Sequence, residues 1–168
     1  MIEFRPIRLE DRATIERYTM PSGICNCDLA FANMFCWLPV YHSAWAVIDG
    51  FLVIRFHIDG GDRIGYMQPV GPEDFTTVIP QLRDDAHAHG QRLRIIGLTD
   101  EGCEVIRRAH PGAFAFESDR NLEDYVYNAA DLRNLTGQHY QPKRNHINRF
   151  TGEYGDYHYE ELTAERFG

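Results

Sequence analysis

A run of basic and amide side chains near the end of the chain is the part of the sequence best suited to bind an anion. Residues 139–150 read HYQPKRNHINRF and hold three fixed positive charges, at Lys143, Arg144 and Arg149, with no carboxylate among them. The whole chain is acidic, with a formal net charge of −8. Lys143 is also its only lysine. The run therefore predicts a local site for a negatively charged ligand.

The position of these cations in a predicted helix strengthens that hypothesis. Pro142 is typical of the first helical turn, because its missing N–H costs no hydrogen bond there. Lys143 and Arg144 follow in the same turn, where each positive charge opposes the helix dipole by about 0.3–1 kcal/mol. Free N–H groups at this end also attract anions, so a bound anion would offset the repulsion. We expect Lys143, Arg144, Asn145 and Asn148 to bind phosphate groups of a polyanion.

The competing interpretation is a solvated surface helix without a ligand. Charge clusters on protein surfaces are commonly of this kind. In that case the cations would pair with carboxylates of the following segment, at Glu153, Asp156 or Glu160. Either way, the helix should dock on a core through its apolar stripe, which consists of Tyr140, Ile147, Phe150 and Tyr154.

The cysteines do not form a convincing metal site. Cys25 and Cys27 are separated by one residue, whereas structural zinc sites use C-x₂₋₄-C pairs. With Cys36 as a third ligand, the fourth would have to be Cys103 or His42. We therefore predict no metal and interpret the thiols as buried groups around an aromatic helix.

Other polar residues give no catalytic assignment. The segment DDAHAHG, residues 84–90, resembles a ligand cluster. On a helix, however, His87 and His89 diverge by about 200°, so a solvated helix end is expected. His57 and Glu104 are candidates for acid–base chemistry, but nothing in the sequence places them together. The catalytic residues stay unassigned.

The elements that must position these residues alternate in type. Hairpin signals such as Asp49-Gly50 dominate the middle of the chain, so we predict an α+β fold with a mixed, mostly antiparallel sheet flanked by helices. The expected strands are 2–7, 43–50, 51–58, 63–71, 92–99, 113–118, 125–132 and 157–162, and the expected helices are 9–20, 29–38, 73–90, 100–110 and 142–150.

Composition limits the class of protein further. Hydrophobic residues make up 43% of the 168 residues and charged residues 25%, which is ordinary for a soluble globular protein. The negative net charge argues against coating nucleic acid or anionic membrane by charge alone. No apolar run approaches the roughly 20 residues that a membrane helix needs, and no secretory leader is visible. We expect a cytoplasmic protein with reduced thiols.

Several longer motifs resemble a known family. They are PSGICNCDLAFANMFCW, WAVIDGFLVIRF, YMQPVG and above all DRNLEDYVYNAADLRNLTGQHYQPKRNHINRF. The chain resembles the bacterial family, mostly uncharacterised, that is named for the C-terminal part of phosphatidylglycerol lysyltransferase. The resemblance implies two acetyltransferase-type (GNAT-like) units in tandem. It also implies an activity, because relatives transfer an aminoacyl group from charged tRNA to a lipid or amine acceptor.

The resemblance also implies a domain organisation. Residues 1–138 correspond to a first GNAT-like unit, and residues 139–168 to the basic helix and a strand leading into a second unit that is absent from this chain. The chain is then a truncated first half, which we expect to be inactive by itself. Lys143, Arg144 and Asn145 match the basic motif of the family, and the implied partner is a charged tRNA or a phospholipid headgroup.

Two alternatives remain open. One is a non-catalytic GNAT-like scaffold or dimerisation module, in which the exposed edge of the strand at 157–162 would recruit a second copy. The other is a coenzyme A-dependent acetyltransferase. Against the latter, the segment QPVGPEDF, residues 68–75, places carboxylates where a pyrophosphate would bind a helix start. We therefore expect no coenzyme A, and no other cofactor, in this unit.

Overall fold

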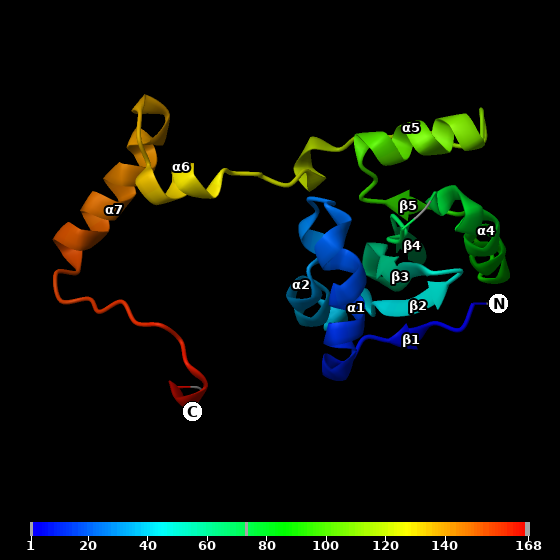
Figure 1. Ribbon diagram of the computed structural model, residues 1–168, viewed down its shortest axis with the longest axis horizontal. Helices are drawn as coiled ribbons and strands as arrows, with labels where there is room; N and C mark the ends of the chain where they lie inside the picture. Colours follow the sequence, from blue (N-terminus) through cyan, green and yellow to red (C-terminus); the bar gives the residue numbers. More distant parts are fainter. Residues whose placement is uncertain (1, 73, 167–168) are drawn as a thin grey trace. The chain divides into compact units, whose positions relative to one another are not determined.

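The chain divides into two compact units. The computed structural model describes residues 2–72 and 74–166. The division falls between Asp124 and Tyr125, and we call the two parts unit 1 and unit 2. In Figure 1, unit 1 runs from blue to yellow-green, and unit 2 continues to red at the C-terminus.

Unit 1 is built on a sheet whose strands lie in sequence order. Within the described residues the sheet has five strands, ordered β1-β2-β3-β4-β5. Neighbouring strands from β1 to β4 are antiparallel, whereas β4 and β5 are parallel. The α+β class with a mixed, mostly antiparallel sheet is therefore confirmed. The strands are β1 (Arg5–Pro6), β2 (Ala44–Ile48), β3 (Phe51–Ile58), β4 (Arg63–Met67) and β5 (Ile95–Ile96).

The turn between β2 and β3 forms as the sequence predicts. Ile48 pairs with Phe51, which leaves Asp49 and Gly50 as a two-residue loop. Both loop residues have positive φ, at 47° and 84°. This is the backbone geometry of a type I′ hairpin turn, for which Asp-Gly is a preferred pair.

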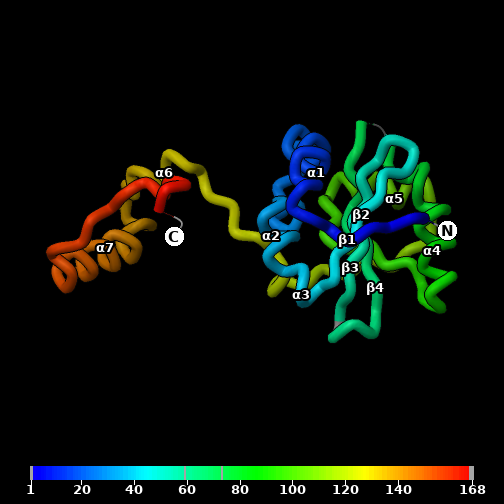
Figure 2. Tube along the Cα trace, turned by 90° about the horizontal axis from the view of Figure 1, so that it is seen from below, coloured from blue at the N-terminus to red at the C-terminus, as the bar shows by residue number. Residues whose placement is uncertain are grey.

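Helices cover both faces of the sheet (Figure 2). α1 (Arg12–Thr19) and α2 (Phe31–Cys36) pack against one face, while α4 (Ile79–Ala88) and α5 (Asp100–Ala109) pack against the other. A short helix, α3 (Leu38–Tyr41), leads into β2. Side chains alternate along β3 as a pleated strand requires. Leu52 and Ile54 join the α1–α2 core, whereas Phe51 and Val53 face α4 and α5.

Three predicted strands do not form. Residues 113–118 are irregular, although Phe114 and Phe116 still pack against the core next to α5. In 125–132 the Asn128 side chain accepts a hydrogen bond from the backbone N–H of Ala130, and a helix begins there instead. Residues 157–162 also have no regular structure. Alternating apolar residues make a strand only beside a partner strand, and these segments have none among the described residues.

The loss of the strand at 157–162 removes the expected sheet edge. An oligomer formed through that edge therefore has no support from the described residues.

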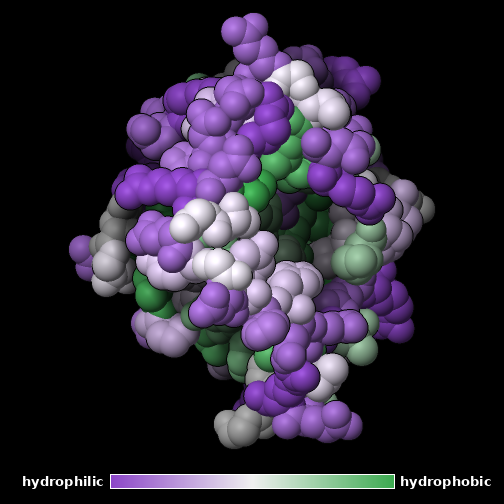
Figure 3. All heavy atoms as spheres, turned by 90° about the vertical axis from the view of Figure 1, so that its left-hand side faces the viewer, coloured by the Kyte–Doolittle hydropathy of each residue, from purple (hydrophilic) through white to green (hydrophobic). Residues whose placement is uncertain are grey.

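Unit 2 consists mainly of two helices, α6 (Ala129–Asn134) and α7 (Gln141–Glu153), and none of their residues is buried. Hydrophilic side chains predominate on the face drawn in Figure 3, with hydrophobic ones between them. No helix in the described residues has the length and apolar character that crossing a membrane requires.

Candidate functional site

The basic run forms the predicted helix. α7 begins at Gln141, so Pro142 is its second residue. No side chain caps the start of α7, and its first turn contains no acidic residue. The positive end of this helix dipole therefore has two cations in its first turn and no carboxylate of its own turn to neutralise them.

Lys143 is exposed and has no acidic partner among the described residues. Its Nζ lies 5.1 Å from the centroid of the Tyr127 ring. Such a cation–π contact at an exposed site is worth only about 0.5–1 kcal/mol. The ring therefore steadies the side chain and leaves the ammonium charge available to an anion.

Arg144 has a structural role that the sequence did not reveal. Its Nη1 donates to the backbone carbonyl oxygens of Leu135 and Gly137, the latter at 2.8 Å, and its Nη2 donates to Oε1 of Gln141. Leu135 is the C-terminal capping residue of α6. The guanidinium thus ties the end of α6 to the start of α7. These bonds use most of its donors, but no carboxylate neutralises its charge among the described residues.

The remaining polar residues of α7 have separate surroundings. Oδ1 of Asn145 accepts a hydrogen bond from Nε2 of Gln141 at 2.8 Å, which leaves the Asn145 amide nitrogen as a donor. Asn148 is exposed, and its backbone carbonyl accepts from the Thr151 hydroxyl. Arg149 lies 4.0 Å from a carboxylate oxygen of Glu153. Among the described residues, pairing with the following acidic residues therefore applies to Arg149 and not to Lys143 or Arg144.

The apolar stripe of α7 does not reach a buried core in unit 2. Ile147, Phe150 and Tyr154 are about half exposed. Phe150 instead makes local ring contacts, with centroid distances of 5.2 Å to Tyr154 and 5.0 Å to Tyr157. The expected docking on a core is thus replaced, in the described residues, by an exposed aromatic cluster.

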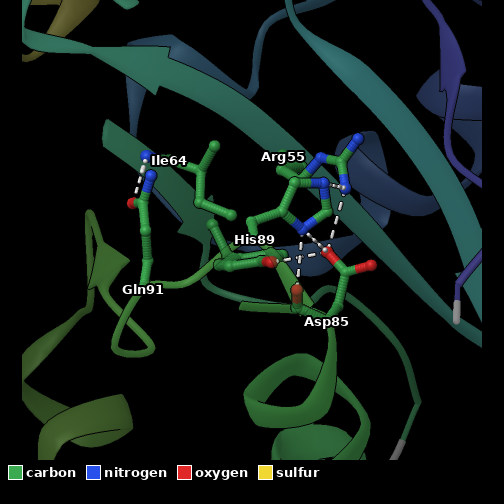
Figure 4. A network of polar contacts seen from close by, with 6 residues as sticks. Arg55, Ile64, Asp85, His89 and Gln91 are labelled. Carbon is green, nitrogen blue, oxygen red and sulfur yellow. Dashed lines mark hydrogen bonds and ion pairs between the residues drawn. The ribbon is translucent and has the colours of Figure 1, made fainter. Parts of the chain in front are cut away.

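In unit 1 the helix end at residues 84–90 is not simply solvated (Figure 4). Asp85 is only 2% exposed, and its Oδ2 accepts hydrogen bonds from Nη1 of Arg55 at 2.9 Å and from the Tyr66 hydroxyl at 2.6 Å. Burial, with the bond to Asp85, raises the pKa of Tyr66 above its usual range. Nδ1 of His89 lies 2.7 Å from the Asp85 carbonyl oxygen. The buried pair Asp85 and Tyr66 thus belongs to a polar network that extends to the half-buried Arg55 and the exposed His89, and the expectation of a solvated end is wrong at Asp85.

The other candidates are not brought together. Nδ1 of His57 lies 3.2 Å from the Gly61 carbonyl oxygen. Glu104 pairs with Arg107 on the same helix. His57 is on β3 and Glu104 on α5, and no contact joins them among the described residues. The structure gives neither residue a catalytic arrangement.

The cysteines are less buried than expected. Cys25, Cys27 and Cys36 are exposed, and only Cys103 is partly covered. The hydrogen bond with the Asp124 carboxylate, together with burial, raises the pKa of the Cys27 thiol to about 11. This thiol is therefore a poor nucleophile at neutral pH. Among the described residues no group of three or more His, Cys, Asp or Glu side chains is placed to hold a metal ion.

The segment after β4 contains a carboxylate, Asp74, that caps the helix following it. Oδ1 of Asp74 accepts hydrogen bonds from the backbone N–H of Thr76 at 2.9 Å and from its hydroxyl at 2.8 Å, which lowers the pKa of Asp74. Asp74 thereby caps the 3₁₀ helix at Phe75–Val78. Glu73, the other carboxylate noted in this segment, lies outside the described residues. An anion at this helix start would have to compete with Asp74.

Comparisons with known proteins agree with the resemblance seen in the sequence. Residues 23–166 match the family described as phosphatidylglycerol lysyltransferase, C-terminal. No match is found among curated proteins. The chain is similar to the solved structure of a conserved protein of unknown function from Bacteroides thetaiotaomicron VPI-5482, with 40% sequence identity and a TM-score of 0.90.

The Bacteroides protein is considerably longer than this chain. The similarity covers 99% of this chain but 55% of the Bacteroides protein, so the chain spans little more than half of its relative. The family match covers most of the chain, including the loop before α2 and the whole of α7. The chain therefore belongs to the phosphatidylglycerol lysyltransferase C-terminal family.

Proposed function

We propose that the chain is one half of a tandem GNAT-like aminoacyltransferase, in which α7 binds phosphate groups of a charged tRNA. In this reading an aminoacyl group passes from the tRNA to a lipid or amine acceptor. Membership of a lysyltransferase-related family supports the reaction class. A relative in which the matched region is 55% of the chain supports a second half.

The sheet of unit 1 supports the GNAT-like assignment. Antiparallel strands up to β4 are followed by a parallel β4–β5 pair, with helices on both faces. Asp74, which caps the helix start after β4, counts against coenzyme A at that position. A donor of another kind, such as a charged tRNA, fits this unit better.

The observation that carries the proposal is the state of Lys143. This lysine lies in the uncapped first turn of α7, exposed and without an acidic partner among the described residues. A phosphate there would meet the Lys143 ammonium and the charge of Arg144, with the amide nitrogens of Asn145 and Asn148 as further donors. Charge-assisted hydrogen bonds of this kind are about twice as strong as neutral ones.

The single lysine gives a direct test. An amine-reactive reagent can modify only one lysine side chain, so its rate at Lys143 reports occupancy of this site. We expect tRNA to protect Lys143 at low salt and to lose that effect as salt rises. Vesicles of anionic phospholipid form the second arm and distinguish a lipid headgroup from a nucleic acid. An unchanged rate in both arms would refute the proposed phosphate site.

A matched substitution adds an equilibrium measurement. Lys143→Ala should weaken tRNA binding and reduce the slope of log K against log salt by about one, the value for one lost phosphate contact. Arg149→Ala removes the same charge from the same helix, but at a residue that already faces Glu153. It should change the slope much less. Equal effects of the two substitutions would indicate a diffuse charge effect and contradict the assignment to Lys143.

A second candidate is a non-catalytic scaffold. The bonds from Arg144 to Leu135 and Gly137 favour it, because they give the basic motif a structural purpose without a ligand. In that case Arg144→Ala loosens unit 2, while no polyanion protects Lys143. The protection experiment therefore separates the two candidates.

A further inference from the structure

Unit 2 has no buried residue in the part that the structure describes. Of residues 125–166, only Leu135, Tyr140 and Arg144 are partly covered, and all the others are exposed. Unit 1, in contrast, encloses three clusters of buried apolar side chains. A folded body gains most of its stability from apolar surface that is removed from water. Unit 2 therefore lacks a core of its own among the described residues.

The exposed apolar side chains of unit 2 gather around the second half of α7. Ile147, Phe150 and Tyr154 follow one another at spacings of three and four residues, which places them on one side of the helix. They are 51%, 47% and 54% exposed. The Phe150 ring contacts the rings of Tyr154 and Tyr157. We call these four side chains the aromatic face, and an exposed apolar patch of this kind marks an interaction site.

The helix that carries the aromatic face is fixed within unit 2. The Arg144 guanidinium donates to the backbone carbonyl oxygen of Leu135, where α6 ends, and so joins α6 to α7. The face begins at Ile147, one turn after Lys143. A partner on the aromatic face therefore does not need the first turn of α7, and this turn stays available to a phosphate.

The chemistry of the face favours a protein partner. Three of its four side chains are aromatic, and aromatic residues, tyrosine among them, are enriched in protein interfaces. A tyrosine there can bury its ring and keep its hydroxyl hydrogen-bonded. A longer relative has additional chain that could supply such a partner. The similarity to the Bacteroides protein covers 99% of this chain, but the other 45% of the Bacteroides protein has no counterpart here.

We propose that the aromatic face docks on the part of the protein that corresponds to this other 45%, and that unit 2 completes its core there. The inference rests on the proposed function for the existence of a second half. It adds the surface on which that half packs, and it requires neither tRNA nor acyl transfer. The boundary between the two halves then falls after Asp124, where the two units divide, instead of after residue 138.

Co-expression tests the docking directly. The unmatched part of the Bacteroides protein is produced with an affinity tag in the same cells as this chain, so that neither polypeptide has to fold alone. We expect the chain to co-purify in equimolar amount. Amide hydrogen exchange over residues 147–157 should slow at least tenfold in the complex relative to the free chain. Failure to co-purify, or unchanged exchange over these residues, would overturn the proposal.

Two substitutions of exposed apolar residues locate the surface. Phe150→Ser removes the ring that contacts both tyrosines and should weaken the complex about tenfold or more, as the loss of an interface anchor does. Met20→Ser is the matched control, because Met20 is an apolar residue of unit 1 that is 78% exposed. Its effect should stay within about twofold. Equal effects of the two substitutions would refute the assignment to the aromatic face.

Measurements on the free chain reveal other occupants of the face. A dimer that forms in light scattering and is abolished by Phe150→Ser would show that a second copy covers it. Sedimentation with phosphatidylcholine vesicles that is lost in the same variant would show a lipid surface. Either result would overturn the choice of partner. Protection of Lys143 by tRNA is a separate readout, so the docking surface and the phosphate site can fail independently.

Discussion

The side chain of Arg144 reaches back to the backbone carbonyl oxygen of Leu135, nine residues earlier, at the point where α6 ends. Leu135 has a left-handed backbone, with φ of 47°, a conformation that costs a non-glycine residue about 1–2 kcal/mol. The guanidinium thus binds the carbonyl of the residue that makes this costly turn, and it fixes the connection between the two helices of unit 2.

The first prediction concerns this connection. Arg144→Ala should reduce the local stability of unit 2 by about 1–3 kcal/mol, because hydrogen bonds from a charged donor are lost. Amide hydrogen exchange along α7 measures the effect. Arg149→Ala is the control, since an exposed pair such as Arg149–Glu153 contributes about 0–1 kcal/mol. Unchanged exchange in Arg144→Ala would show that the bonds to Leu135 and Gly137 do not hold the helices.

A second prediction concerns the buried carboxylate of unit 1. Asp85→Asn should lower the free energy of unfolding by about 3–5 kcal/mol, because Arg55 would keep a largely buried charge without its partner. Urea unfolding measures the change. Asp84→Asn removes the same charge from the neighbouring, exposed residue and should alter stability by about 0.5 kcal/mol or less. Similar losses in the two variants would contradict a special role for Asp85.

A third prediction uses the cap at Asp74. Its hydrogen bonds with Thr76 lower the pKa of the Asp74 carboxyl in the folded chain relative to the unfolded chain. The stabilisation is therefore complete above the unfolded pKa, near 3.9, and is lost as the pH falls through the lower folded value. Asp74→Ala should cost about 1 kcal/mol at neutral pH.

The pH dependence of that cost is the decisive measurement. The stability difference between the parent chain and Asp74→Ala should shrink as the pH is lowered from about 5 to 3. Asp74→Asn, whose side-chain oxygen can still cap the helix, should retain more of the stability at neutral pH. A difference that stays constant with pH would rule out a contribution from the ionised carboxylate.

A fourth prediction concerns the reactivity of Cys27. The Asp124 carboxylate raises the pKa of this thiol to about 11, so little thiolate is present at pH 8. Asp124→Asn should lower the pKa and speed alkylation of Cys27 by iodoacetamide. Mass spectrometry of each cysteine gives the rates, with Cys36 as the internal reference that should not change. A slower or unaltered rate at Cys27 would argue against the contact with Asp124.

Local signals in the sequence predicted a large part of the fold. The Asp49-Gly50 turn, the helix after Pro142 and the helix at 100–110 all depend on residues close together in the chain, and each forms at or near its predicted place. The strand at 157–162 fails because pairing depends on a partner that local alternation does not report. Local propensity was therefore reliable where the hydrogen bonds were also local.

Contacts between distant residues decided the errors at the candidate sites. Asp85 looked solvated because its partners, Arg55 and Tyr66, lie 30 and 19 residues away. The hydrogen bonds of Arg144 to backbone carbonyl oxygens could not be predicted from the sequence, because any residue can supply such an acceptor. In the sequence Gln68 is only part of a loop pattern, because its contact with Thr99, 31 residues later, requires the parallel β4–β5 pair. Every residue has a backbone carbonyl, so the sequence does not show which of them accept hydrogen bonds from side chains.

The close approach of Gln68 to Gly102 also has a consequence for how relatives of this chain can diverge. A Cβ at position 102 would lie 2.5 Å from Oε1 of Gln68, so the end of the glutamine side chain, which accepts the Thr99 N–H, would have to move. We expect homologues with alanine or serine there to carry a shorter side chain at position 68, so the two positions should change together in an alignment.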